Sequence, residues 1–74
     1  MSNMPSLTPK DLIRILLRNG FILDRSRGSH QIYFHPETRK RAIVPMHAKD
    51  LPTGTLMTIL KQAGIDRSEL SAKI

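Results

Sequence analysis

A short turn at Ser26–Ser29, which contains Gly28, constrains the fold more than any other feature of the sequence. It lies between two runs of apolar, β-branched and aromatic residues, Phe21–Arg25 and His30–Phe34, which are typical of β-strands. A connection of this length has no room for a crossover, so the two strands must pair antiparallel as a hairpin. The remaining elements must therefore pack against an antiparallel sheet.

A third strand is expected at Arg41–Val44, where Pro45 ends the run of residues suited to a sheet. A polar turn at His35–Lys40, marked by Pro36, connects it to the second strand. Because both connections are short, the three strands are expected to form an antiparallel meander in the order of the sequence.

The residues that follow Thr8 have the features of an amphipathic helix. The Thr8 side chain is suited to cap the first free amides, Pro9 to occupy the first helical position, and Asn19-Gly20 to end the helix. The apolar stripe of this helix is expected to consist of Leu12, Ile13, Leu16 and Leu17. Ile15 falls outside the stripe and is expected to be exposed.

A second amphipathic helix is expected after the strands, beginning at Thr53 or Thr55 and ending near Ala63. Gly64 follows it and is suited to a left-handed cap. The residues Asp66–Glu69 have the spacing of a capping box, which predicts one last short helical turn.

The order helix, three strands, helix predicts an α+β fold. Each helix has one apolar stripe, so both helices are expected to cover the same face of the three-stranded antiparallel sheet and leave the other face to solvent or a ligand. This is the α-β-β-β-α sandwich of the double-stranded-RNA-binding-domain type. A chain of 74 residues is expected to form one domain, 1–74, with loose ends at 1–6 and 71–74.

The composition argues against several classes of protein. The chain has no cysteine, which excludes disulfides, thiolate chemistry and cysteine-ligated zinc, and favours the cytoplasm. It has no apolar run long enough to span a membrane, and Met1–Pro5 lacks the features of a signal peptide, so no membrane association is expected. The histidines share no metal-ligand spacing and there is no glycine-rich phosphate loop, so no metal and no cofactor are expected.

Basic residues outnumber acidic residues by 12 to 6, which gives a net charge of +6. This charge favours a polyanionic partner, nucleic acid first and an acidic protein second, over a role in solubility alone. The basic residues expected to hold phosphates on both sides of His30 lie on the two turns, the adjoining strand ends and the loop after the third strand: Arg25, Arg27, Arg39, Lys40, Arg41 and Lys49.

His30 is the first candidate for chemistry, because it begins the second strand directly after the turn and its side chain exchanges protons near neutral pH. Gly28 allows the sharp turn and the close approach of a phosphodiester, and Ser29 can donate a hydrogen bond to a phosphate oxygen. His47, in the loop after the third strand, either lines the same groove or makes a structural hydrogen bond. His35 is expected to be an exposed turn residue.

Motifs at these spacings resemble the HicA family of bacterial toxins, from Thr8 to Leu70. They are Gly20-Phe21, Gly28-Ser29-His30 with Tyr33, Val44-Pro45 with His47, and Gly54-Thr55-Leu56 followed by Ile59–Gly64. The resemblance implies a double-stranded-RNA-binding fold and an mRNA interferase, the endoribonuclease toxin of a toxin–antitoxin system, which cleaves mRNA without metal or cofactor. It also implies that His30 is the essential histidine and that a HicB-like antitoxin covers it.

The hypothesis for the chemistry is that neutral His30 takes the proton of a ribose 2′-hydroxyl, whose oxygen attacks the adjacent phosphorus. The amides of Gly28 and Ser29 and nearby cations would stabilise the charge on the phosphate. The general acid is left open among His47, a lysine and water. The alternatives are a non-catalytic RNA-binding module of the same fold and a protein-interaction domain whose basic face meets an acidic partner.

Overall fold

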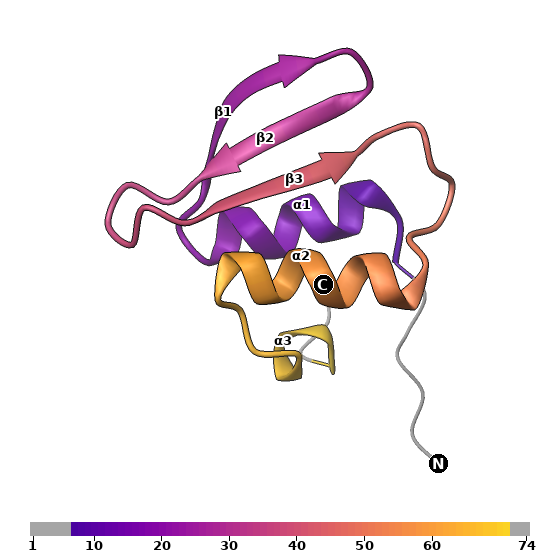
Figure 1. Cartoon of the computed structure of the whole chain (residues 1–74). Coiled ribbons are helices and arrows are strands. Elements are labelled where there is room, and N and C mark those ends of the chain that lie inside the picture. Colours follow the sequence, from indigo (N-terminus) through magenta and orange to yellow (C-terminus); the bar gives the residue numbers. More distant parts are fainter. Residues whose placement is uncertain (1–6, 72–74) are drawn as a thin grey trace.

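The structure is a computed structural model that describes residues 7–71. Its elements are α1 (Pro9–Arg18), β1 (Ile22–Arg27), β2 (His30–Phe34), β3 (Arg41–Pro45), α2 (Thr53–Ala63) and α3 (Ser68–Ser71). The strands form an antiparallel sheet in the order β1-β2-β3, and α1 and α2 both lie on one side of it (Figure 1). The predicted α+β sandwich is therefore confirmed. Of the ends expected to be loose, 1–6 and 72–74 lie outside the described residues, and Ser71 is the last residue of α3.

Helix α1 begins and ends where its capping residues predict. The Thr8 hydroxyl accepts a hydrogen bond from the Asp11 amide, and the Asp11 carboxylate accepts one from the Thr8 amide, both at 3.2 Å. These reciprocal bonds form a capping box, which satisfies two amides that the first helical turn leaves free. At the other end, Gly20 has a φ of +92°, a backbone conformation that residues with a side chain rarely adopt.

The buried face of α1 differs from the expected one. Ile15 is fully buried, whereas Leu17 is 52% exposed. Ile15 and Leu17 lie on opposite edges of the apolar face, so periodicity alone does not decide which of them is buried. Pro9 is buried at the start of α1 and shares a face with Leu12 and Leu16, at the spacing i, i+3, i+7. Packing of this face against the sheet selects the observed rotation.

The hairpin between β1 and β2 is tighter than expected, because β1 continues to Arg27 and the loop consists of Gly28 and Ser29 alone. Gly28 has a φ of +58°, and a glycine at the first position of a two-residue loop is characteristic of type II′ hairpin turns. Strand β2 has the predicted bounds, His30–Phe34, and β3 extends one residue further than predicted, to Pro45.

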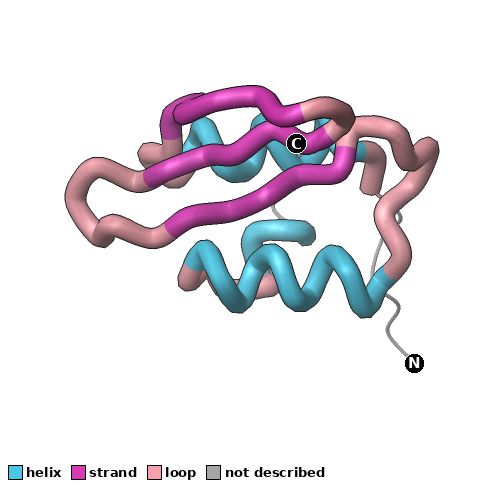
Figure 2. The backbone as a smooth tube through the Cα atoms, turned by 45° about the horizontal axis from the view of Figure 1, so that its top comes forward, coloured by secondary structure: helices cyan, strands magenta, loops and turns pink. Residues whose placement is uncertain are grey.

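The two faces of the sheet have different neighbours. Tyr33 is 4% exposed and lies on the helix side, where its hydroxyl donates a hydrogen bond to Gln31 Oε1 at 2.9 Å. Burial raises the pKa of the Tyr33 hydroxyl above its ordinary value. Successive residues of a strand point to opposite faces, so Phe34 and His30 lie on the other side. Figure 2 shows that none of the helices formed by residues 7–71 covers this open face.

Helix α2 begins at Thr53, the earlier of the two expected positions, and Gly64 caps its end with a φ of +72°. Of the three strands, β3 makes the most contacts with α1 and with α2. Its buried residues Ala42 and Val44 therefore lie at the centre of the core. Before α3, the Asp66 carboxylate accepts a hydrogen bond from the Ser68 amide at 3.0 Å, so an aspartate stabilises the predicted last turn.

The rotation of α1 predicts unequal effects for two substitutions that remove similar side chains. Ile15→Ala is expected to lower the free energy of unfolding by about 2–5 kcal/mol, because it leaves a cavity in the core. Leu17→Ala is expected to change it by less than about 0.5 kcal/mol, because the Leu17 side chain is half exposed. Urea denaturation, monitored by circular dichroism, measures the free energy of unfolding of each variant.

If Ile15→Ala does not fold, Ile15→Val provides the same comparison with an expected loss of about 0.5–1.5 kcal/mol. A larger loss for Leu17→Ala than for either Ile15 variant would contradict the observed rotation.

Candidate active site

His30 is the first residue of β2 and is exposed at the end of the hairpin. It pairs directly with Arg27 on β1 and with Pro45 on β3. Residues directly opposite one another in an antiparallel sheet project from the same face, so the Arg27 guanidinium lies on the same side as the His30 imidazole. The two-residue loop therefore places one cation beside one titratable ring on the open face of the sheet.

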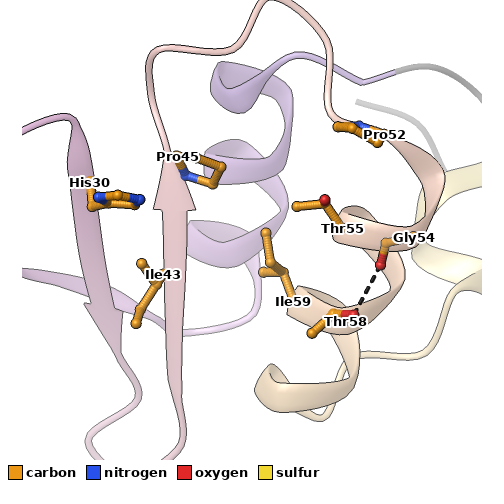
Figure 3. A pocket seen from close by; sticks show the side chains of 8 residues that line it. All are labelled: His30, Ile43, Pro45, Pro52, Gly54, Thr55, Thr58 and Ile59. Atoms are coloured by element: carbon orange, nitrogen blue, oxygen red, sulfur yellow. Dashed lines mark hydrogen bonds between the residues drawn. The ribbon is translucent and has the colours of Figure 1, made fainter.

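Two hollows border the His30 ring. The larger is an open groove of about 660 Å³ between β3 and the first turns of α2 (Figure 3). His30, Ile43 and Pro45 line its strand side, and Gly54, Thr55 and Thr58 line its helix side. The smaller hollow, of about 320 Å³, lies over the open face, and Arg27, Ile32 and Ile43 line it together with His30. A ligand in either hollow would meet the His30 imidazole.

His47 lies beside His30, with 6.2 Å between the ring centroids and 76° between the ring planes. The loop that carries it is held by the Met46 amide, which donates a hydrogen bond to the Ser29 carbonyl at 2.7 Å. Within residues 7–71, the His47 imidazole makes no hydrogen bond to another protein group, and the side chain is exposed. Of the two alternatives for His47, the described residues provide no structural hydrogen bond, and the ring lies next to His30, but His47 is not among the residues that line either hollow.

His35 is not the exposed turn residue that was expected, because it is partly buried and has a structural role. Its Nδ1 accepts hydrogen bonds from the amides of Glu37 and Thr38, at 3.1 and 3.2 Å. Its ring packs edge-on against Phe21, with 5.2 Å between centroids. Its Nε2 lies so near Gly20 that a Cβ on that residue would be 2.7 Å away. His35 thus stabilises the turn before β3 and explains why a glycine precedes β1.

The structure divides the basic residues that were expected to surround His30. Arg27 is beside it, and Lys49 is exposed in the loop that carries His47. Arg39 and Lys40 lie in the turn beyond Phe34, at the opposite end of β2. Four residue steps along a strand separate the two ends by about 13 Å, at about 3.3 Å per residue.

Two further arginines interact with Asp24 of β1, Arg25 from the middle of the sheet and Arg41 from that opposite end. The carboxylate of Asp24 lies 3.6 Å from Arg25 Nε and 3.3 Å from Arg41 Nη1. The Arg41 guanidinium also lies over the Phe34 ring, 5.0 Å from its centroid. These pairs are exposed and screened by solvent, so they orient the arginines without fixing them strongly.

Ile43, Gly54 and Thr55 also line the groove, although the sequence did not single them out as candidate site residues. The available signal was a glycine in the first turn of a helix, where it is less favourable than alanine by roughly 0.5–1 kcal/mol. A Cβ on Gly54 would meet no atom within 4 Å, so packing does not require a glycine there. Its effect is to keep the helix side of the groove open.

The part of the chain described here contains no group of three His, Asp or Glu side chains that could hold a metal ion. None of its helices is long and apolar enough to cross a membrane.

A protein-family model described as the HicA toxin of bacterial toxin–antitoxin systems matches residues 9–65. This range contains both helices that cover the sheet, all three strands, His30 and His47. The chain belongs to the HicA family of toxins. HicA toxins are generally ribonucleases that cleave mRNA and are paired with an antitoxin, so the predicted class, an endoribonuclease toxin with an RNA substrate and an antitoxin partner, is confirmed at the level of the family. A search of curated proteins found no match.

The contacts of the three histidines predict different effects on stability. His35→Ala is expected to lower the free energy of unfolding by about 1–3 kcal/mol, because two amides lose their acceptor. His30→Ala and His47→Ala are expected to change it by less than about 0.5 kcal/mol, because both rings are exposed. Thermal and urea denaturation of the three variants test this. A loss of stability in His30→Ala equal to that in His35→Ala would show that the His30 ring supports the fold.

Proposed function

We propose that this HicA-family chain is a metal-independent endoribonuclease that cleaves mRNA in the cytoplasm, with His30 as the general base. The observation that carries the proposal is the exposed His30 ring, which borders the groove beside α2 and has Arg27 opposite it in the sheet. An imidazole in this position is accessible to an RNA backbone, and the nitrogen of a general base must come within about 2.6–3.2 Å of the oxygen whose proton it removes.

In the proposed reaction, neutral His30 removes the proton of a ribose 2′-hydroxyl. The 2′-oxygen forms a bond to the adjacent phosphorus, and the bond from phosphorus to the 5′-oxygen of the next nucleotide breaks. The products are a 2′,3′-cyclic phosphate and a free 5′-hydroxyl. The Arg27 guanidinium and the amide groups of the Gly28-Ser29 loop offer donors to the phosphate oxygens, whose charge increases in the transition state.

The divided basic residues suggest two roles in binding RNA. Arg27 and Lys49, at the His30 end of the sheet, are proposed to hold the phosphate that is cleaved and its neighbour. Arg25, Arg41, Arg39 and Lys40 extend toward the other end, where they would contact phosphates further along the same strand. Cations spread over this distance match an extended polyanion better than a single small anion.

The antitoxin is proposed to be HicB-like and to cover the hairpin end. Ile43 is 46% exposed and lines both hollows beside His30, so it offers an apolar contact next to the titratable ring. A partner that packs on Ile43 would also bury His30. Acidic residues on that partner would complement the net charge of +6.

A cleavage time course on a defined single-stranded RNA in the presence of EDTA tests the function. The wild-type chain is expected to cleave the RNA and to leave a DNA strand of the same sequence intact, because DNA lacks the 2′-hydroxyl. His30→Ala is expected to lose about 10²–10⁴-fold in rate while it retains RNA binding. Addition of the antitoxin is expected to stop cleavage.

Gln62→Ala, an exposed substitution on α2 that does not line the groove, serves as the control and should cleave like wild type. Cleavage of DNA, or full activity in His30→Ala, would exclude the proposed mechanism. Equal RNA binding without cleavage by both wild type and His30→Ala would favour the non-catalytic RNA-binding module.

The two ends of the sheet predict different effects of arginine substitutions. Arg27→Ala and Arg39→Ala are each expected to weaken RNA binding and to reduce the slope of log K against log salt by about 0.7, the value for one phosphate contact on a single strand. Of these two, Arg27→Ala alone is expected to slow the cleavage of bound RNA as well, because Arg27 is beside His30. Filter binding over a range of salt concentrations and single-turnover cleavage measure the two effects.

Arg67→Ala removes the same charge from a residue before α3, which lines a separate hollow with Lys61 and Ile65. Arg67→Ala is expected to change neither RNA binding, with its dependence on salt, nor the rate at which bound RNA is cleaved. An equal effect of all three variants would mean that net charge, rather than position, determines binding.

A further inference from the structure

We propose that His47 is the general acid of the cleavage, so that His30 and His47 act as a pair on one phosphodiester. The inference rests on the function proposed above and identifies the second proton-transfer group, for which the sequence leaves several alternatives. The observation behind it is the position of the two rings, 6.2 Å apart between centroids and both exposed.

Backbone pairing fixes this separation. His30, the first residue of β2, pairs with Pro45, the last residue of β3. One residue beyond this pair, the Met46 amide donates a hydrogen bond to the Ser29 carbonyl. Met46 is itself partly buried and packs against the core, whereas His47, the next residue of the turn, is exposed. The loop carrying His47 is thus attached at its start to the hairpin that carries His30.

The distance suits an acid and a base that act on opposite sides of one phosphorus. In this reaction the attacking 2′-oxygen and the leaving 5′-oxygen lie roughly in line through the phosphorus, so each proton-transfer group must reach a different oxygen of the same phosphate. The two rings are in edge contact in the structure, and both are exposed, so they have room to turn apart around a phosphate. The described structure has no hydrogen bond between the two rings, and each ring is open to solvent. A phosphate group bound across the two rings, once they have turned apart, would have one imidazole near each of these oxygens.

The proton balance requires the two rings to begin in opposite states. Neutral His30 accepts the 2′-proton as the bond from the 2′-oxygen to phosphorus forms. His47, in its imidazolium form, donates a proton to the 5′-oxygen as the bond from that oxygen to phosphorus breaks. The reaction leaves His30 protonated and His47 neutral. Both rings are exposed, so exchange with water restores the starting states before the next turnover.

The other candidates for the acid have less support in the geometry. Lys49 is two residues further along the loop, and among the described residues it makes neither a hydrogen bond nor a ring contact with His30, whereas His47 makes a ring contact. A lysine is also a weak proton donor near neutral pH compared with an imidazolium, because its ordinary pKa is about 10.4 against about 6.5 for histidine. General acid catalysis is most efficient when the pKa lies near the working pH.

A substrate with a modified leaving group isolates the role of the acid. In an RNA with sulfur in place of the 5′-bridging oxygen at one linkage, the leaving group is a thiolate, which departs without a proton because thiols are much stronger acids than alcohols. His47→Ala is expected to cleave ordinary RNA about 10²–10⁴-fold more slowly than wild type, and to cleave the sulfur-containing RNA within about tenfold of wild type. His30→Ala should lose activity on both substrates, since both require deprotonation of the 2′-hydroxyl.

Two control measurements accompany the test. Binding of a 2′-deoxy analogue reports whether His47→Ala still binds the strand, and Gln62→Ala should match wild type on both substrates. Wild-type activity of His47→Ala on ordinary RNA, or an equal loss on both substrates, would overturn the assignment while leaving His30 as the base. Absence of cleavage of either substrate by the wild-type chain would overturn the proposed function itself, and the assignment of His47 with it.

Discussion

The pairing of β2 with β1 on one side and β3 on the other fixes the position of every group on the open face of the sheet. One row of this pairing, Arg27 with His30 and His30 with Pro45, sets a cation beside the imidazole. The next row, Ser29 with Met46, joins the hairpin loop to the segment that carries His47. A shift of β2 by one residue would turn His30 toward the helices and Tyr33 toward solvent. The burial of Tyr33 therefore also maintains the exposure of His30.

Local signals in the sequence predicted most of the fold. Thr8, Pro9 and Gly20 specify the ends of α1 through capping and backbone conformation, and the structure contains these contacts. Strand β2 and the end of α2 at Gly64 follow from similarly local chemistry. These features depend on residues close together in the chain, so they can be predicted without knowledge of the tertiary arrangement.

The features that sequence reasoning missed depend on contacts between distant segments. The rotation of α1 is determined by what the helix packs against, because Ile15 and Leu17 lie on opposite edges of its apolar face and only one of them is buried. The structural role of His35 depends on the proximity of Phe21 and Gly20, which belong to the segment before β1. The separation of Arg27 from Arg39 follows from the lengths of the strands. The approach of His47 to His30 requires the register of β3 as well as that of β2.

The residues that stabilise the fold and the candidate site residues lie on different faces of the sheet. The side chains that stabilise the fold lie between the sheet and the helices, where Leu12, Leu56 and Val44 are almost fully buried. His30, His47 and Arg27 lie outside this core, where they have little effect on packing. A chain of 74 residues buries a small core, so the desolvation of a buried imidazole would take a large share of its stability. The exposed positions of both imidazoles avoid this cost and leave them accessible to the RNA strand and the antitoxin of the proposed function.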